Sequence, residues 1–190
     1  MSSFYSELEL RDLGFKSFGK NILISKNAKI YGSSNIEIGD NVRIDDFCIL
    51  SGKIKLGSHI HISAGAYFFA GEGGIVMEDF TNISSRCVLY AVNDDYSGLA
   101  LTGSTVPVEY RGITQKKITI KKHSIIGSGS TILPGVSVEE GTAVGCMSLL
   151  INDTMPWMIY VGVPAKPISK RSKQLIKSEL KYLENFIVDA

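Results

Sequence analysis

The sequence lacks the features that would place the protein in a membrane or on a nucleic acid. It has 20 lysine and arginine residues against 19 aspartate and glutamate residues, a net charge of +1, and so we expect no nucleic-acid partner. No apolar run approaches the roughly 20 residues that span a bilayer, which predicts no membrane span. The N-terminus also lacks the basic-then-apolar pattern of a secretory signal, and we therefore expect a cytoplasmic protein.

Cysteine and proline are scarce. The three cysteines, Cys48, Cys87 and Cys146, are odd in number and far apart, which argues against a disulfide framework or a structural zinc site. Each falls within a repeat described below, and so we expect reduced, buried thiols. The 19 glycines against 5 prolines indicate many turns without disorder.

Aliphatic residues recur every six positions along most of the chain. A first series runs from Ile38 to Phe68, resumes at Met77 after a three-residue slip in the glycine-rich segment 71–74, and reaches Leu89. Ile24 and Ile30 extend it weakly toward the N-terminus. The longest unbroken series is Ile120, Ile126, Ile132, Val138, Val144 and Leu150.

A period of six fits neither the 3.6 residues of an α-helix nor the two-residue alternation of a strand. It is typical of a solenoid of short parallel strands in which three hexapeptides form one triangular coil and the aliphatic residues stack inside. Gly39, Gly57, Gly127 and Gly145 follow aliphatic positions, where the coil turns. We therefore predict an all-β fold with one domain over residues 1–190 and the β-helix over 20–165.

Three segments depart from the period. Residues 3–13 begin with serine and precede Gly14, which predicts a short N-terminal helix. Residues 170–187 place Leu175, Leu180 and Leu183 among charged residues, which predicts an amphipathic C-terminal helix. Residues 90–117 form a long excursion, and long loops in compact domains are usually functional.

Three motifs are shared with a known family. The segments IKKHSIIGSGSTILPGV (120–136), VGCMSL (144–149) and GVPAK (162–166) resemble the hexapeptide-repeat acetyltransferases of the galactoside, maltose and xenobiotic type. The resemblance covers residues 20–171. It implies a left-handed parallel β-helix, acetyl-CoA as the co-substrate without a metal, and a homotrimer with active sites between adjacent prisms.

The resemblance also implies which residues bind coenzyme A. The backbone amide of Ser128 would stabilise the oxyanion, and the amide near Cys146 would bind the pantetheine arm. Lys166, with Lys170 or Arg171, would meet the nucleotide phosphates. The full set of cofactor-binding candidates is Gly127, Ser128, Gly145, Cys146, Pro164, Lys166 and Arg171.

A histidine that relatives carry as the base is missing from this chain. Alignment of the start of the excursion with their motif places Asp94 where the histidine would be, while His123 lies in a coil turn, where we expect it to be solvated. A hydroxyl acceptor needs a base, whereas an amine is intrinsically more nucleophilic once it loses its proton. A carboxylate can bind and orient that amine, and so Asp94, supported by Asn93 and Asp95, predicts an amino-sugar acceptor.

The leading hypothesis is an acetyl-CoA-dependent acetyltransferase that acts on a nucleotide-linked amino sugar. The segments DDYSG (94–98) and VPVEYR (106–111) are similar to a subgroup associated with surface polysaccharides, which suggests lipopolysaccharide or capsule biosynthesis. The catalytic candidates are Asn93, Asp94, Asp95 and Ser128. The substrate-binding candidates are Tyr96, Tyr110, Arg111 and His61, and an arginine suits bidentate phosphate contact.

Two alternatives stay open. One is O-acetylation of a sugar hydroxyl, with His61 as the base. The other is a non-catalytic or carbonic-anhydrase-like β-helix trimer, in which His59, His61 and His123 would have to bind zinc between subunits.

Overall fold

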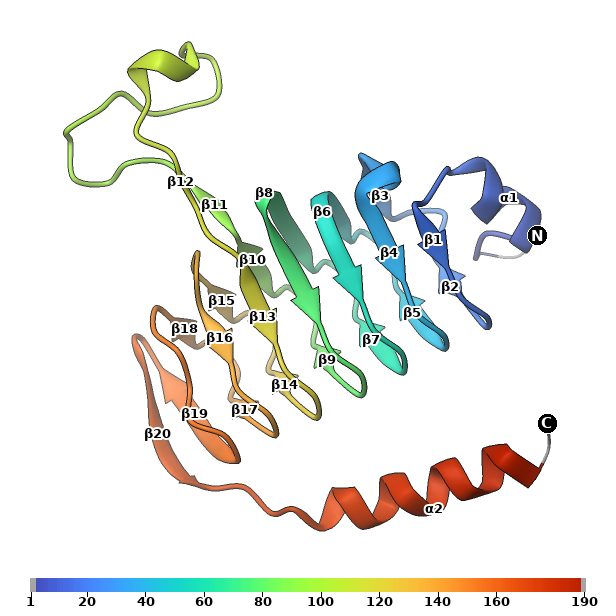
Figure 1. The fold of residues 1–190 in the computed structure, drawn as a ribbon. Helices are drawn as coiled ribbons and strands as arrows, with labels where there is room; N and C mark the ends of the chain where they lie inside the picture. The colour runs from blue at the N-terminus through green and yellow to red at the C-terminus, as the bar shows by residue number, and fades with distance from the viewer. Residues whose placement is uncertain (1–2, 189–190) are drawn as a thin grey trace.

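The computed structural model describes residues 3–188 and shows a three-sided prism of parallel strands (Figure 1). We number the three faces in the order in which each coil crosses them, starting with the face of β3 (Lys29–Tyr31). The second face contains β1 (Ser17–Phe18), β4 (Ile36–Ile38), β13 (Ile118–Ile120) and β16 (Ser137–Val138). The first face contains β3, β10 (Val88–Tyr90), β15 (Thr131–Ile132) and β18 (Leu149–Leu150). Two longer strands, β6 (Ile49–Leu56) and β8 (Tyr67–Met77), bend from the first face onto the second.

The third face contains β2 (Leu23–Ile24), β5 (Val42–Ile44), β7 (Ile60–Ile62), β9 (Asn82–Ile83), β14 (Ile125–Ile126), β17 (Ala143–Val144) and β19 (Met158–Gly162). We call the edge from the third to the first face edge A, that from the first to the second edge B, and that from the second to the third edge C. The predicted left-handed parallel β-helix is confirmed.

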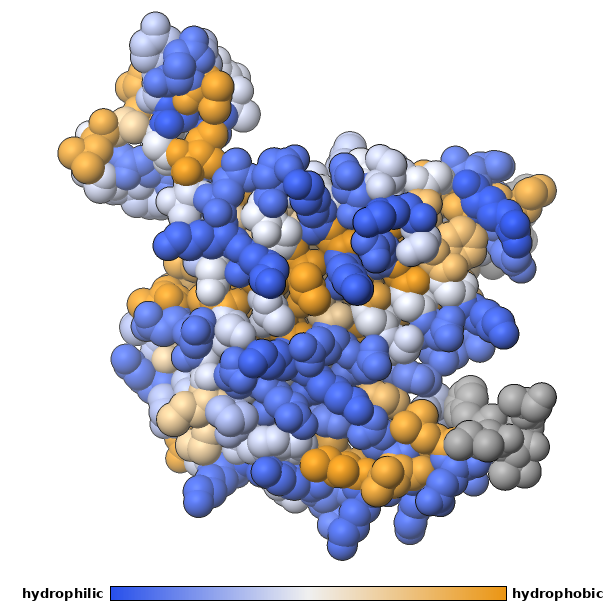
Figure 2. Space-filling model, viewed as in Figure 1, coloured by the Kyte–Doolittle hydropathy of each residue, from blue (hydrophilic) through white to orange (hydrophobic). Residues whose placement is uncertain are grey.

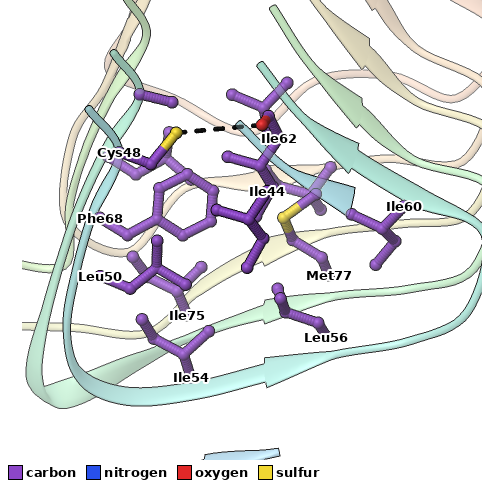
Figure 3. Packing of buried hydrophobic residues seen from close by; sticks show 14 of the residues in the cluster. Ile44, Cys48, Leu50, Ile54, Leu56, Ile60, Ile62, Phe68, Ile75 and Met77 are labelled. Carbon is purple, nitrogen blue, oxygen red and sulfur yellow. Dashed lines mark hydrogen bonds between the residues drawn. The ribbon is translucent and has the colours of Figure 1, made fainter. Parts of the chain in front are cut away.

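The residues that recur every six positions form the core (Figure 3). Apart from Ile30, which is only partly buried, each is at most 4% exposed. Equivalent residues stack from coil to coil: Leu89 pairs with Ile132, and Ile132 with Leu150. The period therefore reports burial directly, because each inward side chain lies on its equivalent in the next coil.

The cysteine prediction is correct at two positions and wrong at the third. Cys48 and Cys87 are buried, and their thiols lie 3.2 Å from the backbone oxygens of Ser63 and Gly127. Burial raises the pKa of both thiols. Cys146 is exposed, because it lies in the turn at edge A and not at an inward position.

The N-terminal helix is shorter than predicted. Helix α1 spans Glu7–Asp12, and a capping box between Ser6 and Glu9 begins it. Residues 3–5 do not join the helix, because their backbone pairs with the first coil: Lys26 donates to the oxygen of Ser3 at 2.9 Å. The predicted start at Ser3 is therefore wrong by one turn.

The C-terminal helix begins later than predicted. Strand β20 (Ala165–Lys170) folds back antiparallel on β19, with Met158 opposite Lys170, and so residue 170 belongs to a hairpin. Helix α2 spans Gln174–Val188 and runs along edge C (Figure 1). Neither helix within residues 3–188 is long and apolar enough to cross a membrane.

The excursion leaves the prism at edge B and projects beyond it (Figure 1). It contains a two-residue antiparallel ladder of β11 (Val92–Asn93) with β12 (Thr114–Gln115), and a 3-10 turn, η2 (Val108–Tyr110). A similar turn, η1 (Ser33–Asn35), lies at the same edge nearer the N-terminus. The predicted excursion over 90–117 is thus present, although Tyr90 still belongs to β10.

Candidate active site

Residues 91–93 and 114–116, which include β11 and β12, form the neck of the excursion. Asp94 is the first residue beyond this neck, and its carboxylate is held by two donors. Arg111 Nη2 donates to Asp94 Oδ1 at 2.7 Å, and the Gly103 amide donates to Asp94 Oδ2 at 3.1 Å. The Arg111 hydrogen bond, together with that from Gly103, holds the pKa of Asp94 below its usual value. Asp94 is therefore an anion at neutral pH and a poor general base, but it is well suited to binding a cation.

Arg111 is more buried than its partner. Its side chain is 18% exposed, against 30% for Asp94. The Nε of Arg111 is buried and has no hydrogen-bond partner among the described residues. Because Nε is buried, a bound molecule cannot reach it in this arrangement, and the side-chain contact that Arg111 makes is the one with Asp94.

Asp95 stabilises the turn that follows Asp94. Its carboxylate accepts hydrogen bonds from the Ser97 hydroxyl at 2.6 Å and from the amides of Ser97, Leu99 and Ala100 at 2.8 to 3.0 Å. These donors, the Ser97 hydroxyl above all, lower the pKa of Asp95 to about 2. Asp95 thus acts on the shape of the loop, and the supporting role in catalysis predicted for it stays a prediction.

The other predicted residues of the excursion are placed differently from one another. Asn93 lies in the neck ladder opposite Thr114. Tyr96 and Tyr110 are 87% and 61% exposed, and so within one chain their rings are free to meet a partner molecule. Leu99, Leu101 and Val108 are also exposed, and Figure 2 shows apolar side chains on the excursion.

A second group of predicted residues lies along edge A. None of the described residues accepts a hydrogen bond from the backbone amides of Ser128 or Cys146. The turns approach closely, since a Cβ on Gly127 would lie 2.6 Å from the Cys146 nitrogen. The packing of the coils thus requires glycine at position 127 regardless of any ligand. The amides of Ser128 and Cys146, in adjacent coils, stay available as hydrogen-bond donors.

The hairpin of β19 and β20 places the remaining cofactor candidates. Pro164 lies in its turn, and Lys166 is exposed on β20. Arg171 is engaged elsewhere: its Nη1 donates to the backbone oxygens of His123 at 2.7 Å and Gly141 at 3.0 Å. That guanidinium fastens the chain to edge C, and burial lowers its pKa.

The histidines lie away from the excursion. On the third face, His61 Nε2 lies 2.8 Å from Asp45 Oδ2, and Arg43 Nε donates to the other oxygen at 2.7 Å. Burial alone would raise the pKa of Asp45, but the hydrogen bonds from His61 and Arg43 lower it. His61 is oriented by a carboxylate, but it lies on the third face, whereas the excursion with Asp94 leaves the prism at edge B.

The prediction that His123 is solvated is wrong. Its side chain is 5% exposed, and Nε2 pairs with Glu179 of α2 at 3.1 Å. Burial lowers the pKa of His123 despite that carboxylate. The Phe80 ring lies 4.4 Å from that of His59 and 5.9 Å from that of His123, and so it separates the two imidazoles. Within residues 3–188 no three metal-ligating side chains gather.

A cavity of about 450 Å³ lies between α2 and edge C, away from both groups of candidates. His59, Phe80, His123, Glu179 and Tyr182 line it. In its lining Glu179 pairs with His123 at 3.1 Å, and it also pairs with Lys122 nearby at 2.6 Å. We assign these side chains to the docking of α2.

The two groups of candidates lie on different edges of the prism. The excursion leaves edge B after β10, whereas Ser128 and Cys146 lie at edge A, before the first-face strands. The first face therefore separates them within one chain. A site that uses both needs the excursion of one chain and edge A of another.

Comparison with known proteins adds to this geometry. A search of protein-family models finds no match. The chain is 43% identical over 190 residues, 98% of each chain, to dTDP-4-amino-4,6-dideoxy-D-glucose acyltransferase of Escherichia coli. It is 33% identical over 115 residues to galactoside O-acetyltransferase of the same species, covering 59% of this chain and 54% of the relative.

Among solved structures, the chain is similar to AntD, an N-acyltransferase from Bacillus cereus. The S84C variant of AntD, in complex with dTDP-4-amino-4,6-dideoxyglucose and coenzyme A, is 50% identical, with a TM-score of 0.95 over 97% of this chain and 99% of that one. AntD has also been solved as S84A and S84T and as D94N and D94A. This chain has serine and aspartate at the same two numbers.

Ser84 was not among the candidates predicted from the sequence. It follows the inward Ile83 in a turn at edge A, half-buried, and its amide donates to the oxygen of Ile126 at 2.9 Å. Its position is equivalent to that of Gly127 in the next coil, since Ile83 pairs with Ile126. The sequence carries no signal that distinguishes it, because Ser25, Asp45 and Ser63 occupy the equivalent position in earlier coils and glycine appears there only at Gly127 and Gly145.

Proposed function

Because the chain belongs to the hexapeptide-repeat acyltransferases that use acyl-coenzyme A, we propose that it transfers an acetyl group from acetyl-CoA to the amino group of a dTDP-linked amino sugar. The observation that carries the proposal is the Asp94 carboxylate, held anionic by Arg111 on an excursion that contains no histidine. An anion of lowered pKa binds an ammonium and does not activate a hydroxyl.

The chemistry at the acceptor needs no strong base. The Asp94 carboxylate binds the ammonium and orients it, and a proton passes to water. The nitrogen of the free amine then attacks the thioester carbonyl carbon, so that an N–C bond forms and the C–S bond breaks. The second proton leaves the nitrogen as the tetrahedral intermediate collapses, and the coenzyme A thiolate takes up a proton from solvent.

The residues of edge A would serve the donor. The free amide of Ser128 would bind the oxyanion, and a preplaced donor of this kind is worth about 3 kcal/mol. The amide of Cys146 would hold the pantetheine arm, which explains why a thiol in place of a smaller side chain is tolerated there. Gly127, Gly145 and Pro164 would shape the groove.

Lys166 would contact the nucleotide phosphates of coenzyme A. Its side chain is exposed, whereas Nη1 of Arg171 already donates to backbone oxygens. Lys170, the residue before Arg171, ends β20 and stays a second candidate for the phosphates. We therefore expect Arg171 to contribute less than Lys166 to binding the phosphates, although the family resemblance implies a phosphate contact for both.

We further propose that the protein works as a homotrimer. The separation of the excursion from edge A supports this, because an adjacent prism would bring Asp94 of one chain to Ser128 of another. The exposed apolar side chains of the excursion would be covered by the same contact. Ser84, at edge A, would then face the acceptor beside Asp94.

The proposed substrate suggests the pathway. Nucleotide-linked amino sugars serve as precursors of surface polysaccharides, and so we propose a role in lipopolysaccharide or capsule biosynthesis. We further propose that the protein acts in the cytoplasm as one domain. Tyr96 and Tyr110, whose rings are exposed, are the candidates for binding the acceptor, while Arg111 acts through Asp94.

A thiol-release assay tests the proposal. With acetyl-CoA and dTDP-4-amino-4,6-dideoxyglucose, the protein should release coenzyme A, and the 4-hydroxyl counterpart of the same sugar should give at most background. Turnover of the hydroxyl sugar at a comparable rate would contradict it and would favour O-acetylation with the Asp45-oriented His61. A parallel series with 3-hydroxybutyryl-CoA, which AntD binds, decides the acyl chain.

A further inference from the structure

The neck of the excursion consists of residues 91–93 and 114–116, and it lies against the glycine-rich slip of β8. Its two sides are joined by a hydrogen bond of 2.9 Å from the Lys116 amide to the Ala91 oxygen. Asp94 is the next residue after this neck. Whatever fixes the neck therefore fixes the direction in which Asp94 leaves the prism.

Gly73 lies against that hydrogen bond. A Cβ on Gly73 would lie 2.8 Å from the Ala91 oxygen and 2.9 Å from the Lys116 nitrogen. Both are backbone atoms, and so no side-chain rotation can relieve the contact. The φ of Gly73 lies outside the left-handed region, which means that the close approach, and not backbone conformation, requires glycine here.

Gly71 and Gly135 complete the contact on either side. A Cβ on Gly71 would lie 3.2 Å from Gln115 Oε1 and 3.2 Å from the Cβ of Val92. The amide of Glu72, which lies between Gly71 and Gly73, donates to the same Gln115 Oε1 at 2.9 Å. On the other side, a Cβ on Gly135 would lie 3.1 Å from Cδ of Lys116. We call Gly71, Gly73 and Gly135 the glycine cradle.

We propose that the glycine cradle positions the acceptor-binding excursion, and that Gly73 is a positioning residue for the transfer reaction. The inference rests on the proposed function, since it assigns the acceptor half of the site to the excursion. A methyl group at Gly73 pushes the neck away from the prism. The projecting loop carries that displacement to Asp94 and Arg111, and a misplacement of about 1 Å costs about 100-fold in rate.

The variant G73A tests the inference, with G32A as its matched control. Gly32 lies at the same edge in an earlier coil. Its φ of +70° strains an alanine, but the Cβ would meet only the Asn35 side chain at 3.8 Å, so G32A strains the prism without contacting the neck. G73A should lower kcat/KM for dTDP-4-amino-4,6-dideoxyglucose by about 100-fold, with a raised KM and a lowered kcat. The Kd for coenzyme A should stay within twofold, at about that of the wild type, and G32A should keep full turnover.

Hydrogen exchange gives a measurement that does not depend on turnover. In G73A the amides of Lys116 and Gly103, which close the neck and hold Asp94, should exchange faster, while those of the core strands keep their protection. G71A, whose methyl group meets side chains of the neck and whose φ of +49° also strains an alanine, should show the same changes. It also serves if G73A does not fold.

The outcomes separate the two proposals. Wild-type turnover with G73A equal to G32A overturns the role of the cradle. Loss of coenzyme A binding and thermal stability in step with turnover overturns it too, because the glycine would then serve only the fold. If the wild type does not acetylate the amino sugar, the proposed function fails, and hydrogen exchange alone tests the role of the glycine cradle. Faster exchange of the Lys116 and Gly103 amides in G73A supports that role, and unchanged exchange overturns it.

Discussion

Replacing Arg111 by methionine should disable Asp94 without touching it. Methionine keeps a long apolar side chain in the partly buried site but offers no donor. Asp94 Oδ1 then loses its 2.7 Å hydrogen bond, and only the longer 3.1 Å contact from Gly103 restrains the carboxylate. Loss of the shorter of two restraints on a positioned group should lower kcat/KM for the amino sugar by about 30- to 100-fold at pH 7.

The same variant should change the pH dependence. In the wild type the pKa of Asp94 lies below its ordinary value, and so the carboxylate stays ionised as the pH falls toward that value. Without Arg111 the pKa rises toward about 3.9, and the anion is lost progressively as the pH falls below about 5. The ratio of kcat/KM for R111M to that of the wild type should therefore fall further between pH 5 and pH 4, where amine protonation affects both enzymes equally.

A double-mutant cycle with D94N identifies the partner through which Arg111 acts. If Arg111 works through Asp94, R111M should add little to the loss already caused by D94N. If the losses multiply, Arg111 binds the acceptor phosphate instead, and the reasoning from the ion pair is refuted. R11M is the control, because Arg11 forms an exposed pair with Glu7 at 2.7 Å and lies far from the excursion; it should leave turnover unchanged.

Three further predictions concern residues outside the excursion. Burial lowers the pKa of His123, so the unfolded chain binds a proton more readily than the folded one; the unfolding free energy should fall as the pH drops below about 6.5, and H123Q should flatten that dependence in denaturant titrations at pH 5.5 and 7.5. K166M should raise the KM for acetyl-CoA about tenfold with kcat unchanged, whereas R171M should instead cost about 2 kcal/mol of stability in urea unfolding, because it strands backbone oxygens. C146A should keep kcat within about twofold and abolish inactivation by thiol reagents, since only the backbone amide is used; a large loss would show that the thiol takes part.

The core could be predicted from the sequence because one rule governs it. Each sixth aliphatic residue meets its equivalent in the next coil, so a one-dimensional period translates directly into burial, as Leu89, Ile132 and Leu150 show. The slip at 71–74 was visible as an interruption of that period. The contact of this slip with the neck could not be predicted from the sequence, because the neck includes Lys116, more than forty residues later.

The errors at His123 and residue 170 occur where distant segments meet. His123 is at an outward position of its coil and was expected to be solvated, but α2 returns over edge C and places Glu179 against it. Residue 170 carries a helix-like pattern, yet β19 pairs with the strand that ends there. For the same reason the partner of Asp94 could not be derived: Arg111 lies 17 residues away, across a loop with no period to follow.

The most direct test of the account is the chemical nature of the product. The enzyme should be incubated with acetyl-CoA and dTDP-4-amino-4,6-dideoxyglucose, a sugar that offers both an amine and hydroxyls, and the acetylated product treated with neutral hydroxylamine. An anionic Asp94 that orients an ammonium predicts an amide, which survives the treatment and no longer reacts with amine reagents. An ester, cleaved by hydroxylamine and still carrying a free amine, would contradict the assignment of Asp94 and return the search for a base to His61.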